Sequence, residues 1–194
     1  MSIEPDPVEP DPIEPDTVEP DTVEPDGKDW TWVLRAPCPE CGYEASSVQP
    51  AALPRRIRTN AQEWVAVLAA GESSRRRPAP GVWSPLEYGC HVRDVLQVFD
   101  RRLVLMLMQD DPLFDNWDQD ATALAERYAE QDPAAVSAEL VAAAELIADR
   151  FGAVRGEQWA RPGRRSDGSA FSVDSLGRYF LHDIVHHAHD VGAR

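Results

Sequence analysis

The sequence has few of the features that mark secreted, membrane and nucleic-acid-binding proteins. Its 194 residues include only 3 cysteines, too few for a disulfide framework. No apolar run is long enough to cross a bilayer, and the first residues lack the basic and apolar segments of a signal peptide. The 19 basic side chains are outnumbered by 34 acidic ones, so no basic excess exists to neutralise phosphates. We therefore expect a cytoplasmic protein without a nucleic-acid or membrane partner.

The net charge of −15 is concentrated at the start of the chain. Residues 4–26 contain ten acidic side chains and no basic one, arranged as a Glu-Pro-Asp unit that recurs every five residues. Because each unit adds at most one Val or Ile, the segment cannot bury enough apolar surface to offset the entropy lost on ordering. We expect residues 1–27 to be a disordered acidic tail. It is interpreted as a solvated spacer or, alternatively, as a binding tail for a basic partner.

Hydrophobic periodicity after residue 50 predicts four long helices. The expected helices cover residues 51–70, 85–106, 133–154 and 173–191. The second has the clearest start, because Ser84 is an N-cap candidate, Pro85 suits the first helical position and Glu87 completes a capping box. Four amphipathic helices with connections of modest length favour an all-α fold, an antiparallel four-helix bundle, for residues 51–194.

The connections between these helices are polar. Residues 109–120 are expected to form a loop that leads into a short helix at 121–130. Residues 161–169 contain Gly and Pro and are expected to form a turn region. The arginines there, Arg161, Arg164 and Arg165, are interpreted either as a solvated loop or as a binding site for an anionic substrate.

Residues 28–50 precede the bundle and have a different character. They combine an aromatic stretch around Trp30 and Trp32 with Cys38-Pro-Glu-Cys41-Gly, which has the spacing and turn residues of one half of a zinc ribbon. A complete structural site needs two more ligands, and the sequence has no second cysteine pair. Three interpretations stay open: an incomplete zinc knuckle or structural thiol pair, inert cysteines, and a redox dithiol. We expect this segment to pack on the bundle as an appendage.

All five histidines lie on two of the expected helices. His91 is on the second helix, and the last helix carries His182, His186, His187 and His189. Helical bundles build metal sites from side chains on facing helices, often one turn apart. That spacing gives two candidate pairs on the last helix, His182 with His186 and Asp183 with His187.

Helical phase separates the two pairs. Asp183 and His187 lie at one flank of the apolar stripe of the last helix, whereas His182 and His186 lie on the opposite face, where we expect solvent. His91 is also at a flank of the stripe on its own helix. Two histidines and one carboxylate leave coordination positions open, which is typical of a catalytic metal site. The alternative is that these are ordinary histidines on helix flanks, and that those in the last turn complement the helix C-terminus.

Two of these helices resemble the DinB-like superfamily. The segment from Trp83 to His91 is similar to its second helix, and the segment from Phe180 to Asp190 is similar to its last one. The superfamily is a four-helix bundle that holds a divalent metal, often zinc or nickel, through three residues. The resemblance implies that His91, Asp183 and His187 are the ligands, with His182 and His186 as an alternative register. Asp183 stands where members of the superfamily commonly have His or Glu.

The resemblance also implies an activity. The superfamily includes mycothiol-dependent maleylpyruvate isomerase and bacillithiol S-transferases, so the expected cofactors are a divalent metal and mycothiol or a similar thiol. The expected reaction is metal-dependent thiol transfer or isomerisation on a small electrophile, with hydrolysis as a variant. The alternative is a non-catalytic helical binding or stress-associated module with a structural metal. The expected partner is a small molecule or thiol, and a homodimer is left open.

Overall fold

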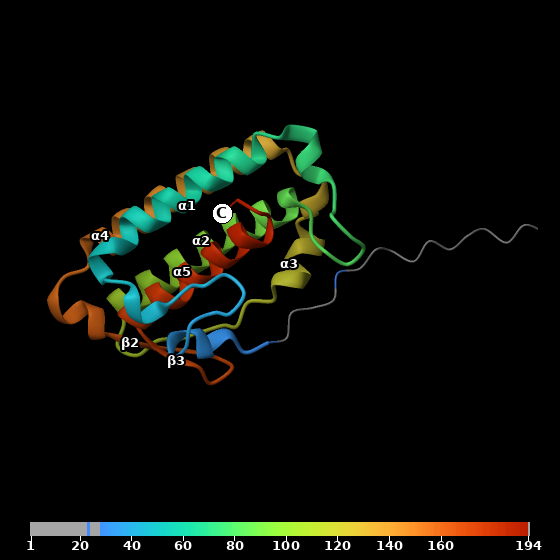
Figure 1. Cartoon of the computed structure of the whole chain (residues 1–194). Coiled ribbons are helices and arrows are strands. Elements are labelled where there is room, and N and C mark those ends of the chain that lie inside the picture. The colour runs from blue at the N-terminus through green and yellow to red at the C-terminus, as the bar shows by residue number, and fades with distance from the viewer. Residues whose placement is uncertain (1–22, 24–27, 194) are drawn as a thin grey trace, which may run out of the picture.

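Four long helices form the body of the structure, a computed structural model that describes Val23 and residues 28–193. They are α1 (Leu53–Leu68), α2 (Pro85–Met108), α4 (Pro133–Ala153) and α5 (Val173–Asp190) (Figure 1). The prediction of four long helices is therefore confirmed. The acidic tail predicted for residues 1–27 lies outside the described residues, apart from Val23. In the described part of the chain, no helix combines the length and apolarity needed to cross a membrane.

The helices surround the core in the order α1, α4, α2, α5. Each packs along the next, and α5 returns to contact α1, so α1 lies diagonally across from α2 and α4 from α5 (Figure 1). Consecutive long helices are thus not all neighbours. The largest fully buried side chains in the core include Trp64, Leu96, Leu140, Ile147, Phe151 and Phe180.

The connections contain a small sheet that the sequence pattern did not predict. It consists of β1 (Leu113–Phe114), β2 (Pro162–Arg165) and β3 (Ala170–Ser172). β2 pairs in parallel with β1 and antiparallel with β3. The sequence predicted a loop at 109–120 and a turn region at 161–169 but not the strands within and beside them, because strands of two to four residues are too short to show an alternating pattern.

The short helix expected at 121–130 is divided in two. α3 (Gln119–Ala125) ends before Arg127, which has a positive φ of 51°, and a single 3-10 turn follows. The 3-10 segments of the structure are Trp30–Leu34, Ala45–Ser47, Pro50–Ala52, Gly71–Arg75, Tyr128–Glu130 and Gly156–Ala160.

Residues 28–50 lie against α5. The hydroxyl of Tyr43 donates a hydrogen bond to the carbonyl of Arg178 (2.7 Å), and the Arg178 guanidinium donates to the carbonyl of Ala45 (2.8 Å). Val33 and Val48 are buried in the same core as the bundle. This segment, called the appendage below, therefore packs against α5 and covers part of its surface.

A buried polar cluster fixes the start of α2. The Ser84 hydroxyl accepts from the backbone N–H of Glu87 (3.2 Å), and the Glu87 carboxylate accepts from the backbone N–H of Ser84 (2.8 Å). Arg77 donates two further hydrogen bonds to this carboxylate, at 2.5 and 3.0 Å. Burial alone would raise the pKa of Glu87, but the hydrogen bonds from Arg77 and Ser84 outweigh burial and hold the pKa below its ordinary value. The capping box predicted from the sequence is confirmed.

Removing this charge should destabilise the fold. Glu87→Gln is expected to lower the free energy of unfolding at pH 7 by about 1–2 kcal/mol, because Arg77 loses its charged partner. A depressed folded-state pKa stabilises above the ordinary value of 4.5, and that stabilisation is lost as the pH falls through the folded-state pKa. The difference between the two proteins, measured by urea denaturation, should therefore shrink below about pH 4.

The exposed Glu157→Gln is the matched control and should change the stability by less than about 0.5 kcal/mol. Equal stability of wild type and Glu87→Gln at pH 7, or a difference that grows on acidification, would contradict the role given to Glu87.

Candidate functional site

His91, Asp183 and His187 lie together between α2 and α5. His91 Nε2 is 3.5 Å and His187 Nε2 is 3.6 Å from Asp183 Oδ1, and the two imidazole centroids are 4.7 Å apart. The spacing of four residues on α5 places Asp183 and His187 on one face, and α2 presents His91 two turns after its capped start. One potential ligand atom from each residue lies within 4.8 Å of the others, so the group could hold a metal ion.

Several polar atoms of this group are buried without a hydrogen-bond partner among the described residues. They are both ring nitrogens of His91 and Oδ1 of Asp183. The separations of 3.5 and 3.6 Å are too long for good hydrogen bonds. They are close to the roughly 3.4 Å expected between two ligand atoms that share an ion at about 2.1 Å in tetrahedral geometry. Since an unsatisfied buried polar atom costs about 1–3 kcal/mol, a bound cation fits these residues better than an empty space does.

The electrostatics of the group also suit a cation. Burial lowers the pKa of His91, so its imidazole is neutral at neutral pH and has a lone pair available for a metal. Burial alone would raise the pKa of Asp183, but the neighbouring His91 and His187 outweigh burial and hold the pKa below its usual range. Asp183 is therefore an ionised carboxylate, the form in which it binds metals.

A neighbouring carboxylate orients the imidazole of His187. His187 Nδ1 donates to Asp190 Oδ2 at 2.9 Å, which directs Nε2 towards Asp183. Asp190 thus fixes the ring of a candidate ligand. His189 is more exposed and lies farther from this group, with its nearest recorded contact to Asp190 at 3.9 Å.

Aromatic rings enclose the group, a role that the sequence did not predict for them. Trp117 stacks on His91 with a centroid distance of 5.4 Å and an interplanar angle of 9°. Trp83 lies 5.4 Å from His91, and Tyr88 lies 5.2 Å from His187. The three rings come from the loop before α3, the segment before α2 and the first turn of α2, so only the folded arrangement reveals them.

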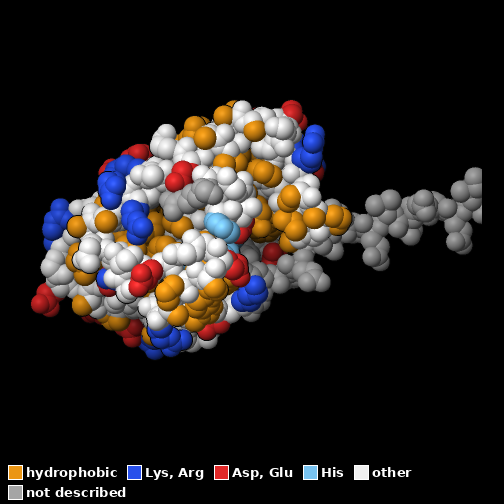
Figure 2. All heavy atoms as spheres, viewed as in Figure 1, with side chains coloured by type: hydrophobic (Ala, Val, Ile, Leu, Met, Phe, Trp, Pro, Cys, Tyr) orange, Lys and Arg blue, Asp and Glu red, His pale blue; other side chains and the backbone are white. Residues whose placement is uncertain are grey.

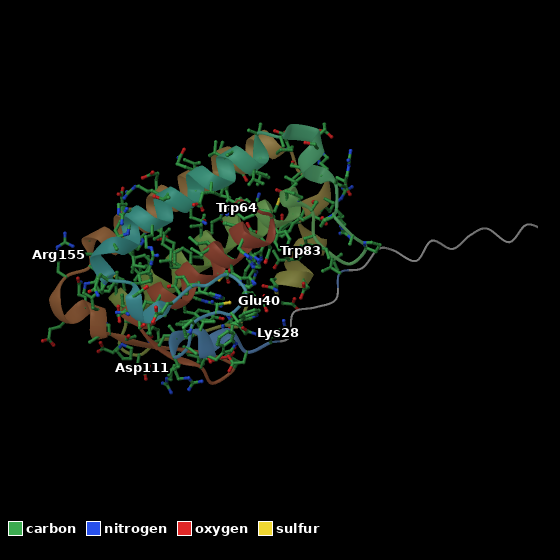
Figure 3. The ribbon with its side chains drawn as sticks, viewed as in Figure 1. Lys28, Glu40, Trp64, Trp83, Asp111 and Arg155 are labelled. Carbon is green, nitrogen blue, oxygen red and sulfur yellow. The ribbon has the colours of Figure 1, made fainter. Side chains whose placement is uncertain are left out.

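A cavity of about 760 Å³ opens beside this group. Asp183 and His187 line it, while His91 is fully buried behind them. Figure 3 shows Lys28, Glu40 and Trp83, which contribute to its wall from the appendage and from the segment before α2. Figure 2 shows a histidine side chain at the surface of this face, flanked by acidic side chains.

The three arginines of the turn region have different surroundings. Arg161 donates to the carbonyls of Met106 and Gln109, and Arg164 binds Asp111, so both stabilise the loop after α2. Arg165 lines the cavity, where its contact of 2.7 Å with Asp167 fixes it. Only Arg165 is therefore placed to contact a molecule in the cavity.

His182 and His186 do not face solvent, and that prediction was wrong. They are 3% and 7% exposed, because the appendage covers their face of α5. The ring of Trp30 lies 5.5 Å from His182 and 5.0 Å from His186, and Cys38 Sγ is 3.7 Å from His186 Nδ1. The two histidines therefore lie with the cysteines of the appendage rather than with His91.

Comparisons with known proteins identify the bundle. The model of the DinB superfamily matches residues 45–191, whereas no curated protein matches the chain significantly. Among solved structures, YfiT from Bacillus subtilis is similar with a TM-score of 0.67 and 17% sequence identity, over 75% of this chain and 85% of YfiT. YfiT is described as a probable metal-dependent hydrolase with an unusual four-helix bundle topology. The likeness to YfiT is one of fold, and the family model matches most of the sequence. The chain therefore belongs to the DinB superfamily.

Proposed function

We propose that this protein is a metal-dependent enzyme in which His91, Asp183 and His187 bind one divalent ion. The observation that carries the proposal is the convergence of these three side chains, with buried atoms that have no hydrogen-bond partner among the described residues, beside a cavity of about 760 Å³. Cavities of this size suit small-molecule ligands. Membership of the DinB superfamily and the description of YfiT as metal-dependent support the same proposal.

The surrounding residues give each ligand a defined place. His91 closes the inner side of the group, and Asp183 and His187 face the cavity, so an ion held by these residues would be accessible to a small molecule in the cavity. Asp190 keeps the ring of His187 in one orientation. A divalent ion, zinc or nickel by resemblance, supplies Lewis acidity that lowers the pKa of a bound thiol or water.

We assign the reaction to transfer or isomerisation on a small electrophile with a low-molecular-weight thiol of the mycothiol type. The cavity is large enough for two small molecules side by side, and Lys28 and Arg165 offer donors for a carboxylate. Trp83 and Trp117 pack on the ring of His91 and Tyr88 packs on the ring of His187, so the aromatic side chains hold the ligand group in place. Hydrolysis is the second candidate, and the fold likeness to YfiT favours it.

Removing one ligand should abolish metal binding at this group. His91→Ala is expected to weaken binding there by more than about 100-fold, because the loss of an outer partner alone costs 10–100-fold. Asp190→Asn, which changes only the partner of His187, should fall within that smaller range. Both are measured by elemental analysis and chelator competition on protein purified without a His tag. The more exposed His189→Ala is the control, and a folded His91→Ala protein with wild-type affinity for every bound ion would refute the assignment.

The activity is tested with thiols and without them. Metal-loaded protein is expected to join mycothiol, bacillithiol or glutathione to a small electrophile, and Asp183→Asn should lower the rate by at least about 100-fold. Asn keeps the shape of the side chain but removes the charge that binds the ion. Turnover of esters or amides without a thiol would favour hydrolysis. Metal binding with neither activity would refute the enzyme proposal and favour the non-catalytic module.

A further inference from the structure

A second group of metal-binding side chains lies where the appendage covers α5. Cys38 and Cys41 come from the appendage, and His182 and His186 come from α5. Each residue offers one sulfur or ring nitrogen, and the four atoms lie within 4.8 Å of one another. We infer that these four residues bind a structural zinc ion, separate from the ion at His91, Asp183 and His187.

The turn at Cys38–Gly42 brings the two thiols together. The carbonyl of Cys38 accepts from the N–H of Gly42 at 2.9 Å, and the N–H of Cys38 donates to the carbonyl of Tyr43 at 2.8 Å. Gly42 has a φ of 70°, a conformation that glycine adopts without strain. This is the tight turn expected of half a zinc ribbon, whose missing ligands are supplied by two histidines one helical turn apart.

The distances and burial suit a tetrahedral zinc site. Cys38 Sγ is 3.7 Å from His186 Nδ1, and a sulfur and a nitrogen that share one zinc are about 3.6 Å apart. His182 Nε2 is buried and has no hydrogen-bond partner among the described residues. Cys38, His182 and His186 are 1%, 3% and 7% exposed. A closed, four-ligand set of two cysteines and two histidines is typical of structural rather than catalytic zinc.

The surroundings complete the pattern of a zinc-bound histidine. The nitrogen of His186 that faces away from Cys38, Nε2, lies 3.4 Å from Glu40 and 3.6 Å from Asp190. Carboxylates behind a ligating imidazole are a regular feature of zinc sites, since they orient the ring and increase its basicity. Trp30 covers both histidine rings and keeps water away.

Such an ion would tie the appendage to the helix that carries Asp183 and His187. Lys28, Trp30 and Glu40 belong to the wall of the cavity. Zinc at the cysteines therefore holds one wall of that cavity in place while taking no part in the reaction proposed above.

Cobalt(II) substitution tests the site on the full-length protein. Metal-free protein is titrated with cobalt(II) under reducing conditions, and thiolate ligation is read from the sulfur-to-cobalt charge-transfer absorption in the near ultraviolet. We expect this absorption to saturate in wild type, to be lost in Cys41→Ser and to persist in His91→Ala. Cys90→Ser is the matched control, because Cys90 is buried elsewhere, against the carbonyl of Tyr128 and the side chain of Gln131.

The total content of divalent metal, with zinc and nickel counted together, gives the complementary measurement. Wild type should hold two equivalents, Cys41→Ser and His91→Ala one each, and Cys90→Ser two. A wild-type protein without thiolate absorption, or one that keeps a Cys38–Cys41 disulfide after reduction and metal addition, would overturn the inference. Thiolate absorption with a single equivalent would support this site and count against the one at His91. The cobalt(II) spectrum of the wild-type protein tests for thiolate ligation by itself, even if Cys41→Ser does not fold.

Discussion

The burial of ionisable side chains along α5 is the constraint on which the rest of the site depends. A polar atom removed from water is costly unless another group satisfies it. α5 presents His182, Asp183 and His187 to faces that the fold covers, α2 on one side and the appendage on another. Each covering element brings further candidate ligands, His91 from α2 and two cysteines from the appendage, so a metal ion shared with α5 would meet this cost.

Helical phase and capping signals predicted the four helices and the shared face of Asp183 and His187, and the resemblance to the DinB-like superfamily paired these two residues with His91. The helices and the shared face follow from local spacing, because residues four apart share a helix face and a capping box marks a helix start. The same reasoning failed for His182 and His186. A helical wheel identifies the face of a helix that the bundle buries. Here residues 28–50, which are far away in sequence, bury a second face of α5, the one that carries His182 and His186.

The enclosing aromatic rings and the small sheet were beyond sequence reasoning for a related reason. Trp117 lies in a polar loop, and nothing in its neighbours indicates that it stacks on a histidine of another element. The strands are too short for a pattern, and β1 depends on pairing with β2, about 50 positions away in the chain. The ligand groups on α5 are offset by one residue and share Asp190, which contacts both His186 and His187. A rotation of α5 would therefore move both groups together.

The diagonal placement of successive helices has a consequence for how the chain acquires its structure. α1 cannot form a hairpin with α2, because its principal partners are α4 and α5. During synthesis the apolar face of α1 must stay without these partners until the chain has passed residue 133. Contacts between α1 and these later helices raise the mean sequence separation of contacting residues. Folding is therefore expected to be slower than in bundles built from adjacent helical hairpins. Apolar surface that stays exposed in this way makes a nascent chain prone to aggregation until the bundle closes.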